Sequence, residues 1–474
     1  MVNFQQKRGI RSLVLYMKVL DKNLKTVCAA VLFALGLMYL VGLTNNLMDY
    51  DEGAIYLYPN MLYKMGFTPY VDFTYGQPPA LLFLPRDLLS ARFFSVLCVF
   101  VSAGAIYLTG KRLGVGIYAS IFFMSCPLVM EFGRLAVGDA PVIALFSVIL
   151  YLMMLGSNWL IELFLIGVLF FAAFMVKIQI AIPVGFMLLY MIFIKKEANY
   201  TVSLVVCAFL CIGAFSLVPG LLQDVIINNL GGYDIERAIL YLVNSVAQFI
   251  IKGGAMLMMF SAYGLYAMRS RFKERNVHVL LSIVFSAVIV CVAYSWLNYR
   301  HFMYLIPVMS VFAGYGLKSF KNKEFAVIVL LVAVLNPIYE LNRSMNYDQA
   351  TRDIAKNITA MVPAGEMIYT DQPMLAHLSN RTMPNTAQQW NGMGRLQGIK
   401  ADDVINDIKD KTPAMVLLVT GTPSSMEQPR LISTFGNNSI KILNFLDESY
   451  KYKDYYRRDW QLIRVWKRND TVHN

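Results

Sequence analysis

The sequence predicts a polytopic α-helical membrane protein with about eleven transmembrane helices and a C-terminal extracytoplasmic α/β domain. Of its 474 residues, 57% are hydrophobic and 15% are charged, and the mean hydropathy is +0.52. This composition is far more apolar than that of a soluble globular protein. Apolar stretches of about the 20 residues that a bilayer requires recur over the first part of the chain.

Each apolar stretch predicts one membrane span. The spans are expected at 27–45, 90–109, 115–131, 140–155, 159–176, 178–194, 202–219, 252–268, 278–296, 302–318 and 325–340. We interpret the first as a retained anchor, because no small-residue cleavage site follows it.

Basic residues orient the membrane portion. They are concentrated before the first span and in alternate loops, for example Lys195-Lys196 and Arg269–Arg275. The positive-inside rule then places the N-terminus in the cytoplasm of a plasma-membrane protein. The net charge of +12 could indicate nucleic-acid binding, but its location between spans argues against such a partner.

Composition changes near residue 341, so we expect a transmembrane domain over 1–340 and an extracytoplasmic domain over 341–474. Short apolar runs predict strands at 366–370, 414–420 and 460–466, and amphipathic patterns predict helices at 348–361 and 401–411. Alternating strands and helices favour a mainly parallel sheet.

Three acids directly follow the first expected span: Asp49, Asp51 and Glu52. Carboxylates near hydrocarbon are costly and often functional, although a solvated loop or a helix N-cap is the simpler interpretation. Asp49-Tyr-Asp51 could also be an Asp-x-Asp metal motif, so a divalent cation remains an alternative.

Two external loops are too long to be simple turns, which favours a functional role. The first, 46–89, has an amphipathic stretch at 55–63 that could lie along the membrane interface, followed by Tyr70–Pro79. Within the latter, Asp72 is either a sugar ligand or a turn residue. The second loop, 220–251, also contains an amphipathic run.

Further polar residues fall at the same expected membrane depth. Each alone could snorkel to lipid headgroups. Together, acids and bases at one level suit a site that binds a lipid phosphate and activates an acceptor hydroxyl. They are Arg134, Asp139, Lys177, Gln179, Tyr299, Arg300 and His301.

The order of these motifs resembles the GT-C glycosyltransferases, and within them the protein O-mannosyltransferases and lipid A aminoarabinose transferases. The resemblance covers about residues 27–340. Its motifs are the Asp51-Glu52 pair, Tyr75-Gly-Gln-Pro-Pro79, Arg134-Leu-Ala-Val-Gly-Asp-Ala-Pro141, Lys177-Ile-Gln179 and Tyr299-Arg-His-Phe-Met-Tyr-Leu-Ile-Pro307.

The resemblance implies transfer of a sugar from a polyprenyl-phosphate carrier to a hydroxyl of a glycan, lipid or protein acceptor, outside the cytoplasm and with inversion. It implies that Asp51 is the catalytic base, with Glu52 beside it and Asp139 positioning sugar or acceptor. Lys177 and Arg300 would hold the departing phosphate. The candidate substrate-binding residues are Asp49, Tyr56, Asp72, Gln77, Arg134, Lys177, Gln179, Tyr299, Arg300 and His301.

Two other function classes remain open from the sequence. Acids and bases within a membrane also mark the pathways of transporters and flippases for lipid-linked or anionic solutes, although the chain has no convincing internal repeat. A noncatalytic scaffold of a glycan pathway is the other alternative. The sugar, the carrier length and the acceptor are not encoded in these motifs.

Overall fold

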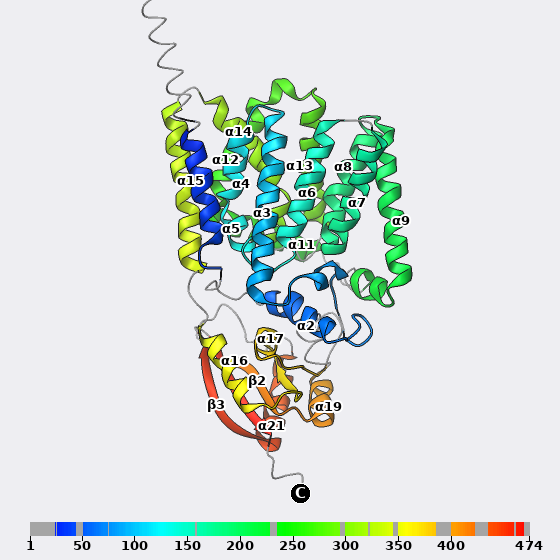
Figure 1. Ribbon diagram of the computed structural model, residues 1–474, viewed down its shortest axis with the longest axis vertical. Coiled ribbons are helices and arrows are strands. Elements are labelled where there is room, and N and C mark those ends of the chain that lie inside the picture. Colours follow the sequence, from blue (N-terminus) through cyan, green and yellow to red (C-terminus); the bar gives the residue numbers. More distant parts are fainter. Residues whose placement is uncertain are drawn as a thin grey trace, which may run out of the picture.

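A computed structural model gives the architecture of the chain (Figure 1). The structure describes residues 24, 26–43, 51–73, 75–156, 159–227, 235–293, 299–320, 323–344, 349–384, 400–421, 435–458 and 461–468. Asp49 lies outside these residues.

The upper part of the molecule in Figure 1 is a bundle of apolar helices. Helices occupy every span that the sequence predicts. They are 26–40, α3 (Leu88–Lys111), α4 (Gly116–Met124), α5 (Pro127–Phe132), α6 (Asp139–Leu155), α7 (Leu160–Val176), α8 (Ala181–Phe193), α9 (Thr201–Leu217), α12 (Ala255–Ala267), α13 (Arg275–Ala293), α14 (Ile306–Ser319) and α15 (Lys323–Ser344).

In the described part of the chain, four helices are long and apolar enough to cross a bilayer: Leu88–Lys111, Ala198–Leu217, Leu242–Ala267 and Glu324–Asn342. Together with the shorter apolar helices, they identify an integral membrane protein. The number of spans, their orientation and the domain boundary near residue 341 stay predictions.

The expected span 115–131 is wrong as a single helix. Helix α4 ends at Met124, Cys126 is extended, and Pro127 starts α5. Because proline lacks the N–H that would continue the hydrogen-bond ladder, the chain breaks before it. The short α5 then leads into residues 133–138 and the start of α6, which carry several candidate site residues.

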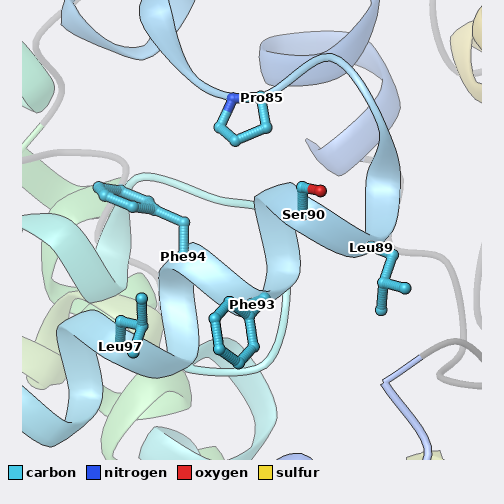
Figure 2. Close-up of a pocket in the computed structure, with 6 residues that line it drawn as sticks. All are labelled: Pro85, Leu89, Ser90, Phe93, Phe94 and Leu97. Atoms are coloured by element: carbon cyan, nitrogen blue, oxygen red, sulfur yellow. The ribbon is translucent and has the colours of Figure 1, made fainter.

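Helix α3 has two different sides. Its residues Ala91, Arg92 and Ser95 are buried. On the other side, exposed apolar residues line a groove together with Ser90 and Pro85, as Figure 2 shows. An apolar outer surface is what a helix in contact with lipid presents. The outer residues are Leu89, Phe93, Phe94 and Leu97.

The C-terminal part contains a four-stranded sheet in the order β1-β2-β4-β3. Its strands are β1 (Ile368–Thr370), β2 (Met415–Gly421), β3 (Tyr450–Arg458) and β4 (Gln461–Arg468). Helices α16 (Gln349–Met361), α17 (Pro373–Ser379), α19 (Ala401–Lys411) and α21 (Ser439–Ser449) accompany it.

The expected mainly parallel sheet is wrong. Strands β1 and β2 are parallel, but β4 pairs antiparallel with both β2 and β3. Strand β3 was not predicted, because its sequence, YKYKDYYRR, is rich in charge. It ends only a few residues before β4, and so short a connection can join only antiparallel strands. A charged strand at the edge of a sheet also discourages pairing with other chains.

The first loop packs between the helical bundle and the C-terminal sheet (Figure 1). It forms η1 (Glu52–Leu57), α2 (Tyr58–Lys64) and η2 (Pro79–Phe83). Tyr58, Met61 and Leu62 are buried in one hydrophobic core with residues of the C-terminal part. The expectation that residues 55–63 rest on lipid is therefore wrong for these side chains, because protein covers them.

Candidate active site

Arg300 joins two carboxylates from distant parts of the sequence. It belongs to η8 (Tyr299–Tyr304), and its Nη1 donates a hydrogen bond to Asp51. Its Nε donates to Oδ2 of Asp139 at 2.9 Å, and its Nη2 lies 2.9 Å from the same oxygen. The guanidinium also lies over the ring of Phe132, 4.3 Å from the ring centroid. One planar cation therefore holds the carboxylates of Asp51 and Asp139 close to each other.

A second cation completes the cluster. Lys177, at the C-terminal end of α7, donates from Nζ to Oδ1 of Asp139 at 2.6 Å. Asp139 is the first residue of α6, where the positive end of the helix dipole favours a carboxylate. His301 also acts electrostatically on Asp139. We call Asp51, Asp139, Lys177, Arg300 and His301 the charged cluster.

The three candidate catalytic acids differ in their access to solvent. The side chain of Asp51 is 33% exposed, whereas that of Asp139 is 1% exposed and that of Glu52 is fully buried. An acceptor molecule can therefore reach Asp51 more readily than either of the other two.

Glu52 is fixed inside the protein by three hydrogen bonds. Its Oε1 accepts from Nε of Arg92 at 2.8 Å, and its Oε2 accepts from Nη2 of Arg92 at 2.6 Å. The backbone N–H of Ala136 donates to Oε1 at 2.7 Å. Both side chains of the ion pair are fully buried. Glu52 thereby ties η1 to α3 and to residues 133–138, and its expected catalytic role stays a prediction.

Tyr56 lies beside the charged cluster. Its side chain is buried and its hydroxyl forms a hydrogen bond with the backbone of Gly138. Burial, followed by the charge of Asp139, raises the pKa of this phenol. A side chain at Gly138 would crowd this contact, since an added Cβ would lie 2.8 Å from Cδ1 of Leu81 and 3.1 Å from the Tyr56 hydroxyl. Tyr56 is therefore a neutral hydrogen-bonding group beside the acids.

Tyr75 is a candidate site residue that the sequence analysis did not select. Its side chain is 2% exposed, its ring lies 5.9 Å from that of Tyr70, and its hydroxyl lies near enough to Tyr56 to be influenced by it. Among the described residues, neither this hydroxyl nor Oε1 of Gln77 has a hydrogen-bond partner. Buried polar groups of this kind normally have partners, so these two atoms are candidate contacts for a ligand. The only signal in the sequence was the position of Tyr75 in the Tyr-Gly-Gln motif.

Other predicted residues lie in different settings. The guanidinium of Arg134 is fully buried and donates to the carbonyl of Val41. Asp72 is exposed and accepts a hydrogen bond from the backbone of Thr68 at 2.6 Å. Such side chain to backbone hydrogen bonds are typical of turns. Gln179 is half-buried in η3 (Ile178–Ile180), and Tyr299 begins η8 next to Arg300.

The described residues of the charged cluster do not form a divalent-metal site as they are placed, and Asp49 of the Asp-x-Asp motif lies outside the described residues. The described part of the chain has no group of three or more His, Cys, Asp or Glu side chains that could hold one. Asp51 and Asp139 face Arg300, so a metal between them would have to displace this guanidinium.

Comparison with known proteins decides the fold. No protein-family model matches the chain, and no curated protein matches its sequence. The structure is similar to ArnT from Cupriavidus metallidurans in the apo state, with a TM-score of 0.65 and 14% identity over 96% of this chain and 99% of that one. The chain has the GT-C fold.

Two further solved structures agree. ArnT bound to undecaprenyl phosphate matches with a TM-score of 0.63 and 12% identity, over 95% of this chain and 98% of that one. The oligosaccharyltransferase of Archaeoglobus fulgidus, in a complex with Zn and sulfate, matches with a TM-score of 0.58 and 13% identity, over 92% of this chain and 72% of that one. The GT-C fold that the motif order implied is confirmed.

Proposed function

We propose that this protein transfers a sugar from a polyprenyl-phosphate carrier to an acceptor hydroxyl on the extracytoplasmic face of the membrane. The observation that supports this proposal most directly is the arrangement around Arg300. One accessible carboxylate, Asp51, and one buried carboxylate, Asp139, share a guanidinium, and Lys177 lies beside them. Likeness to ArnT bound to undecaprenyl phosphate supports a lipid-phosphate donor.

Asp51 is the proposed base. The acceptor oxygen attacks the anomeric carbon, the bond from that carbon to the phosphate oxygen breaks, and the acceptor proton passes to Asp51. Attack from the side opposite the phosphate inverts the anomeric configuration. A positioned base of this kind contributes typically about 10²–10⁴-fold to the rate.

Lys177 and Arg300 are the proposed phosphate clamp. Negative charge builds on the phosphate as it leaves, and positioned cations stabilise this charge. Arginine presents a planar fork that matches phosphate oxygens. Because Arg300 already holds Asp51, an arriving phosphate competes with Asp51 for the guanidinium, which leaves the carboxylate free to accept the proton.

Tyr75, Gln77 and Tyr56 are the proposed sugar and acceptor contacts. The unpartnered hydroxyl of Tyr75 and the amide oxygen of Gln77 suit a ligand that carries several hydroxyl groups, because a hydroxyl can both donate and accept. Their arrangement does not select one sugar.

The test is a transfer assay. Purified protein in lipid nanodiscs is incubated with a panel of polyprenyl-phosphate sugars and with glycan, lipid and protein acceptors, and release of the polyprenyl phosphate is followed for wild type and Asp51→Asn. The proposal expects one or more donors to lose their sugar with wild type only. Equal release with both proteins would refute Asp51 as the base. In sealed proteoliposomes, movement of intact lipid-linked sugar across the bilayer without release would favour a flippase.

A further inference from the structure

Helix α17 of the C-terminal part packs directly on η1, the element that begins with Glu52 and directly follows Asp51. The contact is closest at Gly53. A Cβ added to this glycine would lie 2.7 Å from the backbone N of Met374, 2.9 Å from its Cα and 3.0 Å from its Cβ. Two of these atoms belong to the backbone, so changing the Met374 side chain would not make room for a larger residue. Only glycine allows α17 and η1 to approach this closely.

A small apolar core surrounds this contact. Leu57 of η1, Ala91 of α3, Ala136 of the 133–138 segment and Met374 of α17 pack together, and each is at most 4% exposed. Four segments that are distant in the sequence therefore meet at one point. Since protein interiors are close-packed, a shift of one segment is transmitted to the others.

Polar contacts add to this packing of α17 on η1. The imidazole of His377 of α17 lies close to the backbone of Leu57. The backbone N–H of Met383 donates to the Tyr58 hydroxyl at 2.7 Å, and Arg86 donates to the side chain of Asn380. The contacts of α17 thus extend along η1 and into α2.

Asp51 immediately precedes η1 and lies two residues before Gly53. Its position therefore depends on where η1 lies. The two cations of the proposed phosphate clamp come from other elements, Lys177 from the end of α7 and Arg300 from η8. A displacement of η1 would move Asp51 without moving α7 and η8, the elements that position Lys177 and Arg300.

We propose that α17 is a positioning element for Asp51, acting through the contact between Gly53 and Met374. This inference rests on the proposed function. It means that the C-terminal part contributes to the rate of transfer in addition to any role in acceptor binding. Gly53, Met374 and His377 are positioning residues in this proposal and do not touch the reacting atoms.

The main test compares Gly53→Ala with Gly104→Ala. An alanine at position 53 must push α17 away, whereas a Cβ at Gly104 meets nothing within 4 Å. A misplacement of about 1 Å can cost about a hundredfold in rate. We expect Gly53→Ala to lower kcat by about ten- to a hundredfold while its affinity for the polyprenyl-phosphate carrier stays that of wild type. Gly104→Ala should retain both.

A second pair of variants keeps the inference testable if Gly53→Ala does not fold. His377→Leu removes the polar side chain beside the Leu57 backbone, and His377→Gln keeps a polar side chain there. We expect kcat to fall in the leucine variant and to recover partly in the glutamine variant, again with unchanged carrier affinity. Wild-type kcat in folded Gly53→Ala, or in His377→Leu, would overturn the inference. Equal losses of kcat and carrier affinity would also overturn it, because they indicate general damage.

The two proposals can fail separately. Asp51→Asn is measured in the same assay. If Asp51→Asn is inactive and Gly53→Ala is fully active, the positioning role of α17 is wrong and the base assignment stands. If Asp51→Asn retains wild-type activity, the base assignment itself is wrong, and so is a positioning role that depends on it.

Discussion

Glu52 and Arg92 form a fully buried, two-pronged ion pair beside the accessible Asp51. The two acids that follow one another in the sequence therefore have different surroundings. Arg92 also donates to the carbonyl of Leu43 at 2.8 Å, so its guanidinium connects the end of the first helix to the candidate site. This relationship gives Glu52 a structural role that can be separated from catalysis by experiment.

Breaking this ion pair should destabilise the protein. Glu52→Gln leaves the charge of Arg92 buried without a counter-ion, and the loss of one partner of a buried pair costs about 3–5 kcal/mol. Thermal unfolding in detergent should show a lower midpoint for Glu52→Gln and for Arg92→Met. The double variant Glu52→Leu/Arg92→Met should recover part of the loss. Single variants as stable as wild type but inactive would instead identify Glu52 as catalytic.

Asp51→Asn should fold normally and lose about 10²-fold or more in transfer rate, because it keeps the size of the side chain but cannot take up a proton at neutral pH. The rate is measured as release of polyprenyl phosphate at saturating donor. Asp402→Asn, an exposed acid of α19, is the matched control and should have wild-type activity. Normal turnover by Asp51→Asn would contradict the assignment.

Neutralising either cation should weaken carrier binding. Lys177→Ala and Arg300→Ala each remove a charge-assisted contact worth about 1.5–3 kcal/mol, which corresponds to about ten- to a hundredfold in Kd. Arg300→Lys should restore binding only in part, because a point charge does not reproduce the planar fork. Titration with polyprenyl phosphate measures the effect.

Lys252→Ala provides the control for these titrations. Lys252 pairs with Glu131, with Nζ 2.9 Å from Oε1, and has no part in the proposed clamp. Its variant should bind the carrier as wild type does. Unchanged affinity in Lys177→Ala and Arg300→Ala would show that these cations only hold the carboxylates.

Tyr75→Phe should lower activity without lowering stability. Its hydroxyl has no hydrogen-bond partner among the described residues, so its removal costs no intramolecular bond. A lost hydrogen bond to a ligand is worth about 0.5–1.5 kcal/mol, or about two- to twelvefold in kcat/KM. Tyr58→Phe should show the opposite pattern, since it leaves the N–H of Met383 without its acceptor. A stability loss in Tyr75→Phe would contradict this prediction.

His377 should make folding sensitive to acid. Burial, together with the charge of Arg86, lowers the pKa of its imidazole to about 4 from the ordinary value of 6.5. Between pH 4 and 6.5 the unfolded chain binds the proton and the folded chain does not, so stability rises with pH across this window. Across the whole window, the free energy of unfolding changes by an amount on the order of 3 kcal/mol.

The measurement is the thermal midpoint between pH 4 and 7. His377→Gln should show a smaller rise than wild type over this range, because it lacks the titrating group. The same slope in both proteins would mean that the imidazole titrates normally.

Local sequence was enough to locate the helices of the bundle. Apolar length predicted each of them except the break between α4 and α5, because a segment in lipid must satisfy its own backbone hydrogen bonds. The motif order also led to the GT-C fold. It selected Asp51, Asp139, Lys177 and Arg300, which the structure brings together although they come from four separate segments.

Only the tertiary structure decided which of these residues are buried in structural contacts and which are accessible to a substrate. Asp51 and Glu52 are neighbours in the chain, yet burial against Arg92 fixes Glu52 while Asp51 stays accessible. Three other features could not be predicted from the sequence. They are the antiparallel β3–β4 pair, the unpartnered Tyr75 hydroxyl and the packing of α17 on Gly53. Each depends on contacts between residues far apart in sequence, and the energy of such contacts is set by burial and geometry, which no local pattern records.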